Sequence, residues 1–290
     1  MTDLSVVTAV TDQDGAVQVA DAAARAAGVS VREVAELSDL EQVVALFSDI
    51  WARSANPPMP LELLRAFSKA GNYVAAAFEG GTMVGACVGF FHAPSEDALH
   101  SHIAGLSRAA TGRSIGFALK LHQRAWAIGR GVSEVAWTFD PLVARNAYFN
   151  LTKLGAIPDE YLPNFYGSMT DGINAGDDSD RLLVRWRLRE PLVALTCAGA
   201  AAPPSVADEL ARGAVVALSV DEDGEPVVGR LDGAVSLVAV PADIERVRAT
   251  APALAQRWRI ATREALMPLV AAGGRIEGFD RTGWYVVRRR

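Results

Sequence analysis

Residues His100 to Gly131, HSHIAGLSRAATGRSIGFALKLHQRAWAIGRG, decide the fold of this chain. The run from His100 to Ser107 carries apolar and small residues and no helix cap, which predicts a strand. Beyond the short turn from Thr111 to Ser114, apolar residues recur at helical spacing and predict a helix that Gly129 and Gly131 end. The apolar positions of this helix are Ile115, Ala118, Leu119, Ala125, Trp126 and Ile128.

A strand, a glycine-bearing turn and a helix N-terminus together suit a phosphate group. Such a turn points several backbone N–H groups, and the positive end of the helix dipole, at one spot. Gly112 and Gly116 leave room for close approach, and Arg113 adds a fixed positive charge. An ordinary strand–turn–helix unit that binds nothing has the same pattern, because two glycines four residues apart are weak evidence by themselves.

The segment resembles motif A of the GNAT superfamily of acyl-CoA-dependent N-acyltransferases. In that family the fourth strand leads into an Arg/Gln-x-x-Gly-x-Gly/Ala turn that holds the pyrophosphate of coenzyme A. The matching run here is Thr111 to Gly116, with Thr111 where Arg or Gln is usual and Ser114 where Gly is usual. The resemblance implies that coenzyme A is bound by Leu106, Ser107, Arg108, Thr111, Gly112, Arg113, Ser114, Ile115 and Gly116.

A second stretch, Trp137 to Ala156, resembles the fifth strand and the following helix of the same fold, and it ends in the family's Lys-x-Gly. Leu151 stands where the family commonly has the tyrosine that protonates the departing thiolate, and Ala144 stands where an asparagine is usual. Tyr148 is the nearest candidate for the proton donor, but a core tyrosine is the favoured interpretation. Asn146 is the corresponding candidate for cofactor binding.

The resemblance covers roughly residues 29–189 and implies an α+β fold, in which helices flank a mixed, mostly antiparallel sheet. The predicted elements of this part follow one another in the order β-α-α-β-β-β-α-β-α-β, which is the GNAT order. Residues 1–28 are expected to form an N-terminal helical extension. Residues 190–290 are expected to form a smaller α+β C-terminal domain, which could cover the acceptor site or mediate dimerisation.

Local signals predict further boundaries. The capping box Ser38-Asp39-Leu40-Glu41 opens a helix predicted over Leu40 to Arg53. Glu79-Gly80-Gly81-Thr82, between two apolar runs, predicts a hairpin. A long helix is expected from Asp243 to Ala272, with an interruption near Pro252.

Composition limits the class of protein. The 290-residue chain is half hydrophobic, so it can bury a sizeable core. A formal net charge of −6 and a pI near 5.3 argue against nucleic acid or an anionic membrane as the main partner. Two cysteines make no disulfide framework, no Cys/His cluster has metal-ligand spacing, and no apolar run is long enough to span a membrane. The sequence therefore predicts a cytoplasmic protein without a metal site.

Direct acyl transfer to an amine needs bound substrates, an N–H donor for the thioester carbonyl and a base for the amine proton. The resemblance puts the N–H donor where the fourth strand bulges, near Gly105 to Ser107. His100 and His102 lie two residues apart on one side of their strand, and they are the candidates for the base. Surface or hydrogen-bonded histidines are the other interpretation, and Glu96 and Asp97 are alternative bases.

Two regions could line the acceptor site. Trp51, Met59 and Phe67 lie on the predicted helix pair, or just before its second helix, and would form one apolar wall, or belong to the core. The polar and aromatic segment from Tyr161 to Asp180, which includes Asp171, either lines the site or forms a structural Ω-type loop.

The resemblance implies a GNAT-type N-acyltransferase, with acetyl-CoA as the expected donor (or another acyl-CoA) and the amine of a small molecule as the expected acceptor. A homodimer is compatible with the sequence. The alternative is a catalytically inactive GNAT-like module that binds a ligand or acts structurally.

Overall fold

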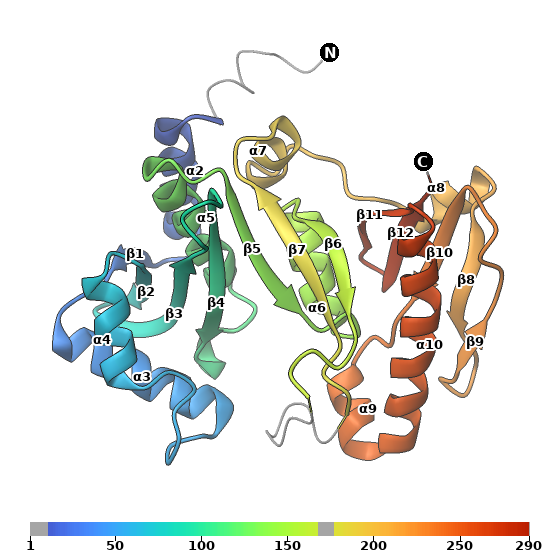
Figure 1. Ribbon diagram of the computed structural model, residues 1–290, viewed down its shortest axis with the longest axis horizontal. Coiled ribbons are helices and arrows are strands. Elements are labelled where there is room, and N and C mark those ends of the chain that lie inside the picture. Colours follow the sequence, from blue (N-terminus) through green and yellow to red (C-terminus); the bar gives the residue numbers. More distant parts are fainter. Residues whose placement is uncertain (1–10, 168–176, 290) are drawn as a thin grey trace. The chain divides into compact units, whose positions relative to one another are not determined.

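The computed structural model describes residues 11–167 and 177–289, and it has the predicted α+β fold with two sheets (Figure 1). The strands of the larger sheet are β1 (Ser30–Glu33), β2 (Tyr73–Glu79), β3 (Thr82–Phe91), β4 (Ala98–Leu106), β5 (Glu134–Phe139), β6 (Ile157–Leu162) and β7 (Arg181–Arg187). Their order in the sheet is β1-β2-β3-β4-β5-β7-β6. The pairs from β1 to β4 and the pair β6–β7 are antiparallel, whereas β4 and β5 are parallel. The sheet is therefore mixed and mostly antiparallel, as predicted.

The smaller sheet lies in the C-terminal part of the chain. Its strands are β8 (Val215–Val220), β9 (Pro226–Val228), β10 (Val235–Ala239), β11 (Arg275–Asp280) and β12 (Trp284–Arg288), in the order β11-β12-β10-β8-β9. The helices are α2 (Gln13–Ala26), α3 (Leu37–Trp51), α4 (Leu61–Lys69), the 3₁₀ turn η1 (Arg108–Ala110), α5 (Ile115–Gly129), α6 (Ala144–Ala147), the π-helix η2 (Tyr148–Lys153), α7 (Pro191–Cys197), α8 (Val206–Ala211), α9 (Ile244–Thr250) and α10 (Pro252–Ala271).

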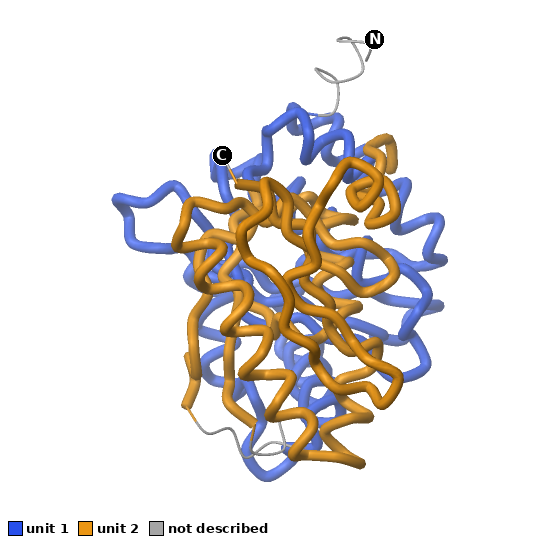
Figure 2. Tube along the Cα trace, turned by 90° about the vertical axis from the view of Figure 1, so that its right-hand side faces the viewer, with its two compact units in different colours: residues 1–137, 187–198 blue, residues 138–186, 199–290 orange. Residues whose placement is uncertain are grey.

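The chain divides into two compact units, coloured in Figure 2. The first unit contains residues 1–137 and 187–198, and the second contains residues 138–186 and 199–290. The segment from the end of β5 to β7 therefore groups with the C-terminal part of the chain. The domain boundaries predicted at 28/29 and 189/190 remain predictions.

In the first unit, helices cover both faces of the strands from β2 to β4. Val74 of β2 packs in one core cluster with Phe47 of α3 and Leu64 of α4. The preceding residue, Tyr73, points to the other face, where its hydroxyl lies 2.9 Å from Nδ1 of His122 on α5. Because side chains alternate along a strand, β2 can bury one set of residues against α3 and α4 and the other against α5.

The predicted hairpin between β2 and β3 is confirmed. Glu79 pairs with Thr82, so the loop consists of Gly80 and Gly81. Both glycines have positive φ, 54° and 88°, as a two-residue turn of type I′ requires.

The capping box predicted at Ser38 is wrong. Helix α3 begins at Leu37, three residues earlier than expected, and its N-cap, Glu36, makes no side-chain hydrogen bond. The earlier start places Asp39 in the first turn, where a negative charge is favourable, and Arg32 of β1 donates to its carboxylate at 2.8 Å. This contact between elements outweighs the local capping pattern.

Some other helices and strands differ from the predicted ones, and one predicted helix interruption is present. The helix predicted after β5 consists of α6 followed by the π-helix η2, and β6 and α7 were not predicted. The interruption predicted near Pro252 is confirmed, because Ala251 takes a non-helical conformation between α9 and α10. Among the described residues, no helix is both long and apolar enough to cross a membrane.

In the second unit, the C-terminal strands bond to the segment that follows β5. The hydroxyl of Tyr285 on β12 donates to the carbonyl of Pro141 at 2.7 Å. Thr152 of η2 donates to the carbonyl of Phe279 on β11 at 2.7 Å, and Thr152 Oγ1 accepts from the Phe279 N–H at 3.2 Å. These bonds explain why residues 138–186 and the C-terminal part form one unit.

Candidate functional site

Strand β4 is paired along its length on one side and only at its beginning on the other. It pairs with β3 from Leu99 to Leu106, whereas its parallel pairing with β5 covers Ala98, Leu99 and His100. In the described part of the chain, β4 has no partner strand on the β5 side beyond His100. Exposure rises one residue later, since Ser101 is still buried whereas His102 and Ala104 are exposed. We call residues 101–106 the open edge of β4.

The bulge in β4 lies at His102, not near Gly105 as expected. The register with β3 steps from Gly89↔Ser101 to Val88↔Ile103, so that His102 is the extra residue. Gly105 itself is in regular register, and an added Cβ there would approach Ile50 to 2.7 Å and Trp51 to 3.0 Å. Gly105 is therefore required for close packing against α3.

The bulge also reverses which residues face which layer. Ser101 bonds to Lys120 of α5, whereas Ile103 packs against the core formed with α3 and α4. Two residues apart in a regular strand would share one face. The extra residue, His102, is the reason that they do not.

The turn between β4 and α5 presents a series of free backbone donors. The N–H groups from Gly112 to Gly116 have no acceptor among the described residues. Gly112 and Ser114 have positive φ, 81° and 62°, and the turn ends at the N-terminus of α5. Successive N–H groups in such conformations form a concave site for anions. An added Cβ at Gly112 would meet no atom within 4 Å, so the site has room for a ligand.

The remaining turn residues hold this loop in place. Ser107 donates its N–H to Val84 at 2.9 Å, and Thr111 donates its N–H to the carbonyl of Arg108 at 3.3 Å. Ile115 is fully buried and anchors the first turn of α5. Leu106 lies close to Gly116, with 3.6 Å between its Cδ1 and the position of a Cβ there.

Arg113 does not point freely into the turn. Its guanidinium forms two hydrogen bonds with the carboxylate of Glu79, at the tip of the β2–β3 hairpin. These hydrogen bonds lower the pKa of Glu79. The charge that the sequence assigns to a phosphate is therefore shared with a carboxylate of the protein.

The two candidate bases, His100 and His102, lie near a third histidine, His92, whose ring is 6.1 Å from that of His100. The rings of His100 and His102 are 6.1 Å apart, and both lie near Phe90, at 5.0 and 5.6 Å. Burial, supported by the charges of His102, His92 and Lys120, lowers the pKa of His100 to about 4. His100 is therefore neutral near pH 7, which is the form that a general base needs.

His102 is more exposed, yet the protein around its ring still lowers its pKa by desolvation. The alternative base Glu96 accepts or shares a hydrogen bond with His92 at 2.9 Å, and Asp97 bonds to Ser133. These two carboxylates of the loop before β4 thus have structural partners.

The other predicted catalytic and binding residues belong to the second unit. Asn146 lies in α6, and Tyr148 opens the π-helix η2, where its ring lies 5.9 Å from the guanidinium of Arg281. Leu151, at the family's tyrosine position, is buried. The roles predicted for Asn146 and Tyr148 remain predictions.

The two candidate acceptor regions are largely structural in the described residues. Met59 is buried in the core, and Trp51 and Phe67 pack against that core. In the segment after β6, the hydroxyl of Tyr161 donates to Asp180 at 2.7 Å, and Ser179 donates to Asn164 at 3.2 Å. Asp171 lies outside the described residues.

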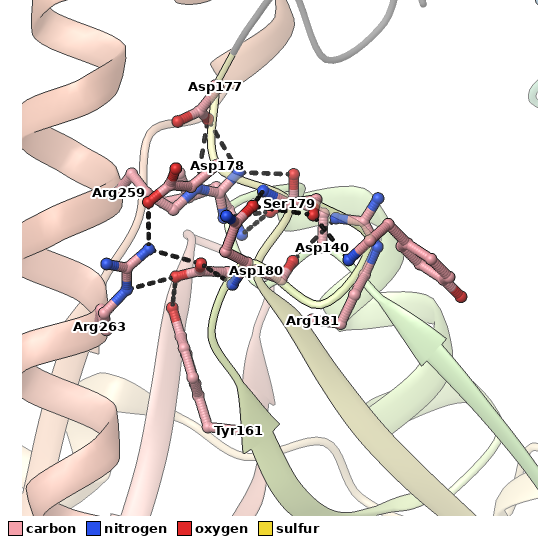
Figure 3. A network of polar contacts seen from close by, with 12 residues as sticks. Asp140, Tyr161, Asp177, Asp178, Ser179, Asp180, Arg181, Arg259 and Arg263 are labelled. Carbon is pink, nitrogen blue, oxygen red and sulfur yellow. Dashed lines mark hydrogen bonds and ion pairs between the residues drawn. The ribbon is translucent and has the colours of Figure 1, made fainter. Parts of the chain in front are cut away.

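The second unit also contains a buried network of charges (Figure 3). Asp140, directly after β5, accepts hydrogen bonds from Arg248 at 2.6 Å and from Arg259 at 2.8 and 2.9 Å. Burial alone would raise the pKa of Asp140, but Arg259 and Arg248 together lower it to about 2. Next to this group, Arg263 bonds to Asp180 at 2.6 and 2.9 Å. No sequence signal pointed to this network.

A pocket of about 360 Å³ lies elsewhere in the second unit, between α9, the start of α10 and the end of β8. Its walls include Val220, Val247, Leu254 and Trp258, and none of the predicted site residues lines it. In the described ranges, no group of three or more His, Cys, Asp or Glu residues could hold a metal ion.

Three residues near the open edge of β4 and the turn were not predicted: Glu79, Ser101 and Lys120. A signal for Lys120 existed, because the helix 115–128 has apolar residues on all sides and its polar residues must then be buried as well. Glu79 and Ser101 depend on contacts between elements, which the sequence does not show.

No protein-family model matches the sequence, and no curated protein matches it. Solved structures do match. A ribosomal-protein-alanine N-acetyltransferase from Brucella melitensis is 19% identical, with a TM-score of 0.46, over 54% of this chain and 98% of its own. A structure from Salmonella typhimurium with its cofactor acetyl-CoA is 15% identical, with a TM-score of 0.47, over 56% of this chain and 95% of its own. The PaiA N-acetyltransferase from Thermoplasma acidophilum, in complex with coenzyme A, is 14% identical, with a TM-score of 0.40, over 55% of this chain and 98% of its own.

The part of the chain that these structures cover has a fold similar to that of GNAT acetyltransferases. The likeness covers about 55% of the chain and concerns the fold alone. The remaining C-terminal part has no counterpart in these structures, as expected for an extension.

Proposed function

We propose that the protein is an acyl-CoA-dependent N-acyltransferase that transfers an acyl group directly to the amine of a small molecule. The observation that carries the proposal is the open edge of β4 leading into a turn with five free N–H groups at the N-terminus of α5. An extended amide chain can add to a free strand edge, and a pyrophosphate suits the turn. Coenzyme A combines an amide-containing arm with a pyrophosphate, so it fits both features.

Residues of the first unit would supply the chemistry. Backbone N–H groups along the open edge would polarise the thioester carbonyl. His100, neutral near pH 7, would take the amine proton, directly or through a water molecule. The expected donor is acetyl-CoA, and the acidic composition favours a small-molecule acceptor over a nucleic acid or a membrane. The predicted cytoplasmic location is part of this proposal.

The first experiment is a calorimetric titration with acetyl-CoA, of the native protein and of Gly116→Asp. The new carboxylate fits sterically, because the nearest atom to a Cβ at Gly116 is 3.6 Å away. It would lie in the first turn of α5, where a negative charge favours the helix but repels a phosphate. The neutral, equally large Gly116→Asn is the matched control.

Micromolar binding by the native protein and by Gly116→Asn, lost in Gly116→Asp, is the expected result. Absence of binding by the native protein to acetyl-CoA and to longer acyl-CoAs would reject the proposal. Binding without turnover on a panel of amines would instead support the alternative, a catalytically inactive GNAT-like module. The engagement of Arg113 by Glu79 and the apolar Leu151 are the observations that favour this alternative.

A further inference from the structure

A closed ring of hydrogen bonds lies between α5 and the sheet in the first unit. Lys120 Nζ donates to Ser101 Oγ at 3.1 Å and to Gln123 Oε1 at 2.7 Å. Gln123 Nε2 donates to Cys87 Sγ at 3.5 Å, and Cys87 Sγ lies 3.8 Å from Ser101 Oγ. The ammonium of Lys120 also lies 3.7 Å from the centroid of the Trp137 ring. All five side chains are buried.

The ring lies where β4 and β5 separate. The last pair of the two strands is His100↔Ala136, and Ser101 and Trp137 are the next residue of each strand. The bulge at His102 turns Ser101 toward α5, so that its hydroxyl meets Lys120. Lys120 is thereby placed beneath the start of the open edge.

The bonds of Lys120 constrain the hydroxyl of Ser101. An ammonium can only donate, so Ser101 Oγ is the acceptor and its own proton must point to another atom. The acceptor within reach in the ring is the sulfur of Cys87, at 3.8 Å, and sulfur is a weak acceptor. The Ser101 hydroxyl can therefore turn as a donor toward a stronger acceptor at the open edge.

We propose that Ser101, supported by Lys120, protonates the departing thiolate at the proposed acyltransferase site. This inference rests on the proposed function. Ser101 is the catalytic residue, because its hydroxyl would contact the sulfur, and Lys120 is a positioning residue that acts through Ser101. The pair would supply the proton that the family takes from a tyrosine at the position of Leu151.

Every proton that moves in the proposed transfer has a donor and an acceptor. The amine nitrogen forms the C–N bond and loses one proton to His100 or water, and the C–S bond breaks with its electron pair on sulfur. Ser101 gives its proton to that sulfur and receives one from Lys120. Lys120 regains a proton from solvent before the next cycle, and His100 returns its proton to solvent.

The surroundings of Lys120 suit this exchange. Burial lowers its pKa to about 8, although the charge of Cys87 on β3 opposes the effect. His100 on β4 is a second titratable group near it, and Lys120 lowers the pKa of this histidine. Gln123 and Trp137 also contact the ammonium, and neither carries a charge. Lys120 is therefore mostly protonated at pH 7, with a pKa near the value of about 8.5 for an ordinary thiol.

The test measures the thiol pKa of coenzyme A bound to the protein, from the ultraviolet absorbance of its thiolate. The native protein should lower this pKa by about one unit or more relative to free coenzyme A, because a nearby cation stabilises the thiolate. Lys120→Met should abolish the shift, and Ser101→Ala, which removes the hydrogen-bond donor but keeps the charge, should reduce it. Lys120→Arg, which also keeps the charge, should retain part of it. Ser48→Ala is the matched control, since Ser48 and Ser101 are both 8% exposed and the Ser48 hydroxyl donates to the carbonyl of Val44 within α3.

The possible failures are distinguishable. Bound coenzyme A with an equal thiol pKa in the native protein and in Lys120→Met would overturn this inference and leave the proposed function intact. Absence of binding by the native protein would overturn both. Lys120→Met should fold, because replacing a buried charge by an apolar side chain of similar length is often neutral or stabilising. Ser101→Ala gives an independent answer, because it removes the donor without touching the charge.

Discussion

Arginine–carboxylate pairs behave differently in the two units. At the candidate site, Arg113 and Glu79 are 42% and 43% exposed, and both are bonded at the surface of the first unit. In the second unit, Arg248 and Arg259 are 3% and 1% exposed, and both bond to the buried Asp140. The same chemical pair is thus solvated in one unit and enclosed in the other.

This difference teaches which charges are available to a ligand. An exposed pair contributes little to stability and can exchange its carboxylate for a phosphate. A buried pair cannot open, because removal of one partner leaves an uncompensated charge in the interior. The network around Asp140 is therefore a structural element, even though two arginines bond to its carboxylate.

The largest expected effect is that of Asp140→Ala. It would remove one of the two buried carboxylates that Arg248 and Arg259 share, the other being that of Asp177. Because Asp177 still compensates part of the charge, we expect a loss of about 3 kcal/mol in the free energy of unfolding. Urea unfolding would measure it. The control is Asp178→Ala, which removes a carboxylate that is 49% exposed and bonded to Arg263, and which should change stability far less. Similar losses in both variants would contradict the distinction between buried and exposed pairs.

The lowered pKa of Asp140 predicts that the stability of the fold depends on pH. The pKa of Asp140 is about 2 in the folded protein, below the ordinary value of about 3.9. A lowered pKa means that ionised Asp140 stabilises the fold above about pH 4 and that this stabilisation, about 2 to 3 kcal/mol, is lost as pH falls toward 2. Unfolding free energies measured between pH 5 and pH 2 should therefore fall more steeply for the native protein than for Asp140→Ala. If the unfolding free energies of both proteins fall equally with pH, carboxylates other than Asp140 cause the acid sensitivity, and the prediction is wrong.

The sequence predicted elements whose signals are local. The hairpin at Gly80 and Gly81 and the interruption near Pro252 lie where expected, because turn glycines and prolines act over a few residues. The GNAT-like turn was also visible, since its glycines are close together in the chain.

Features that depend on distant partners were not predictable. Asp140 meets Arg248 and Arg259 at separations of 108 and 119 residues, which no local pattern records. The bulge at His102 depends on the register with β3, and it decides that Ser101 meets Lys120. The site could be predicted as a location, whereas its charge partners could not.

The smallest expected effect is that of Glu79→Gln at the exposed pair. The hydrogen bonds from Arg113 lower the pKa of Glu79, so the carboxylate is charged at neutral pH and competes with a phosphate for the guanidinium. Its neutralisation should tighten the binding of coenzyme A, by about fivefold at most because the pair is exposed and screened. Calorimetry at low and high salt would measure the gain, which should shrink as salt rises. Glu41→Gln, which makes the same charge change at an exposed position of α3, is the control. An equal gain in both variants would mean that net charge, and not the Arg113–Glu79 pair, sets the affinity of the turn.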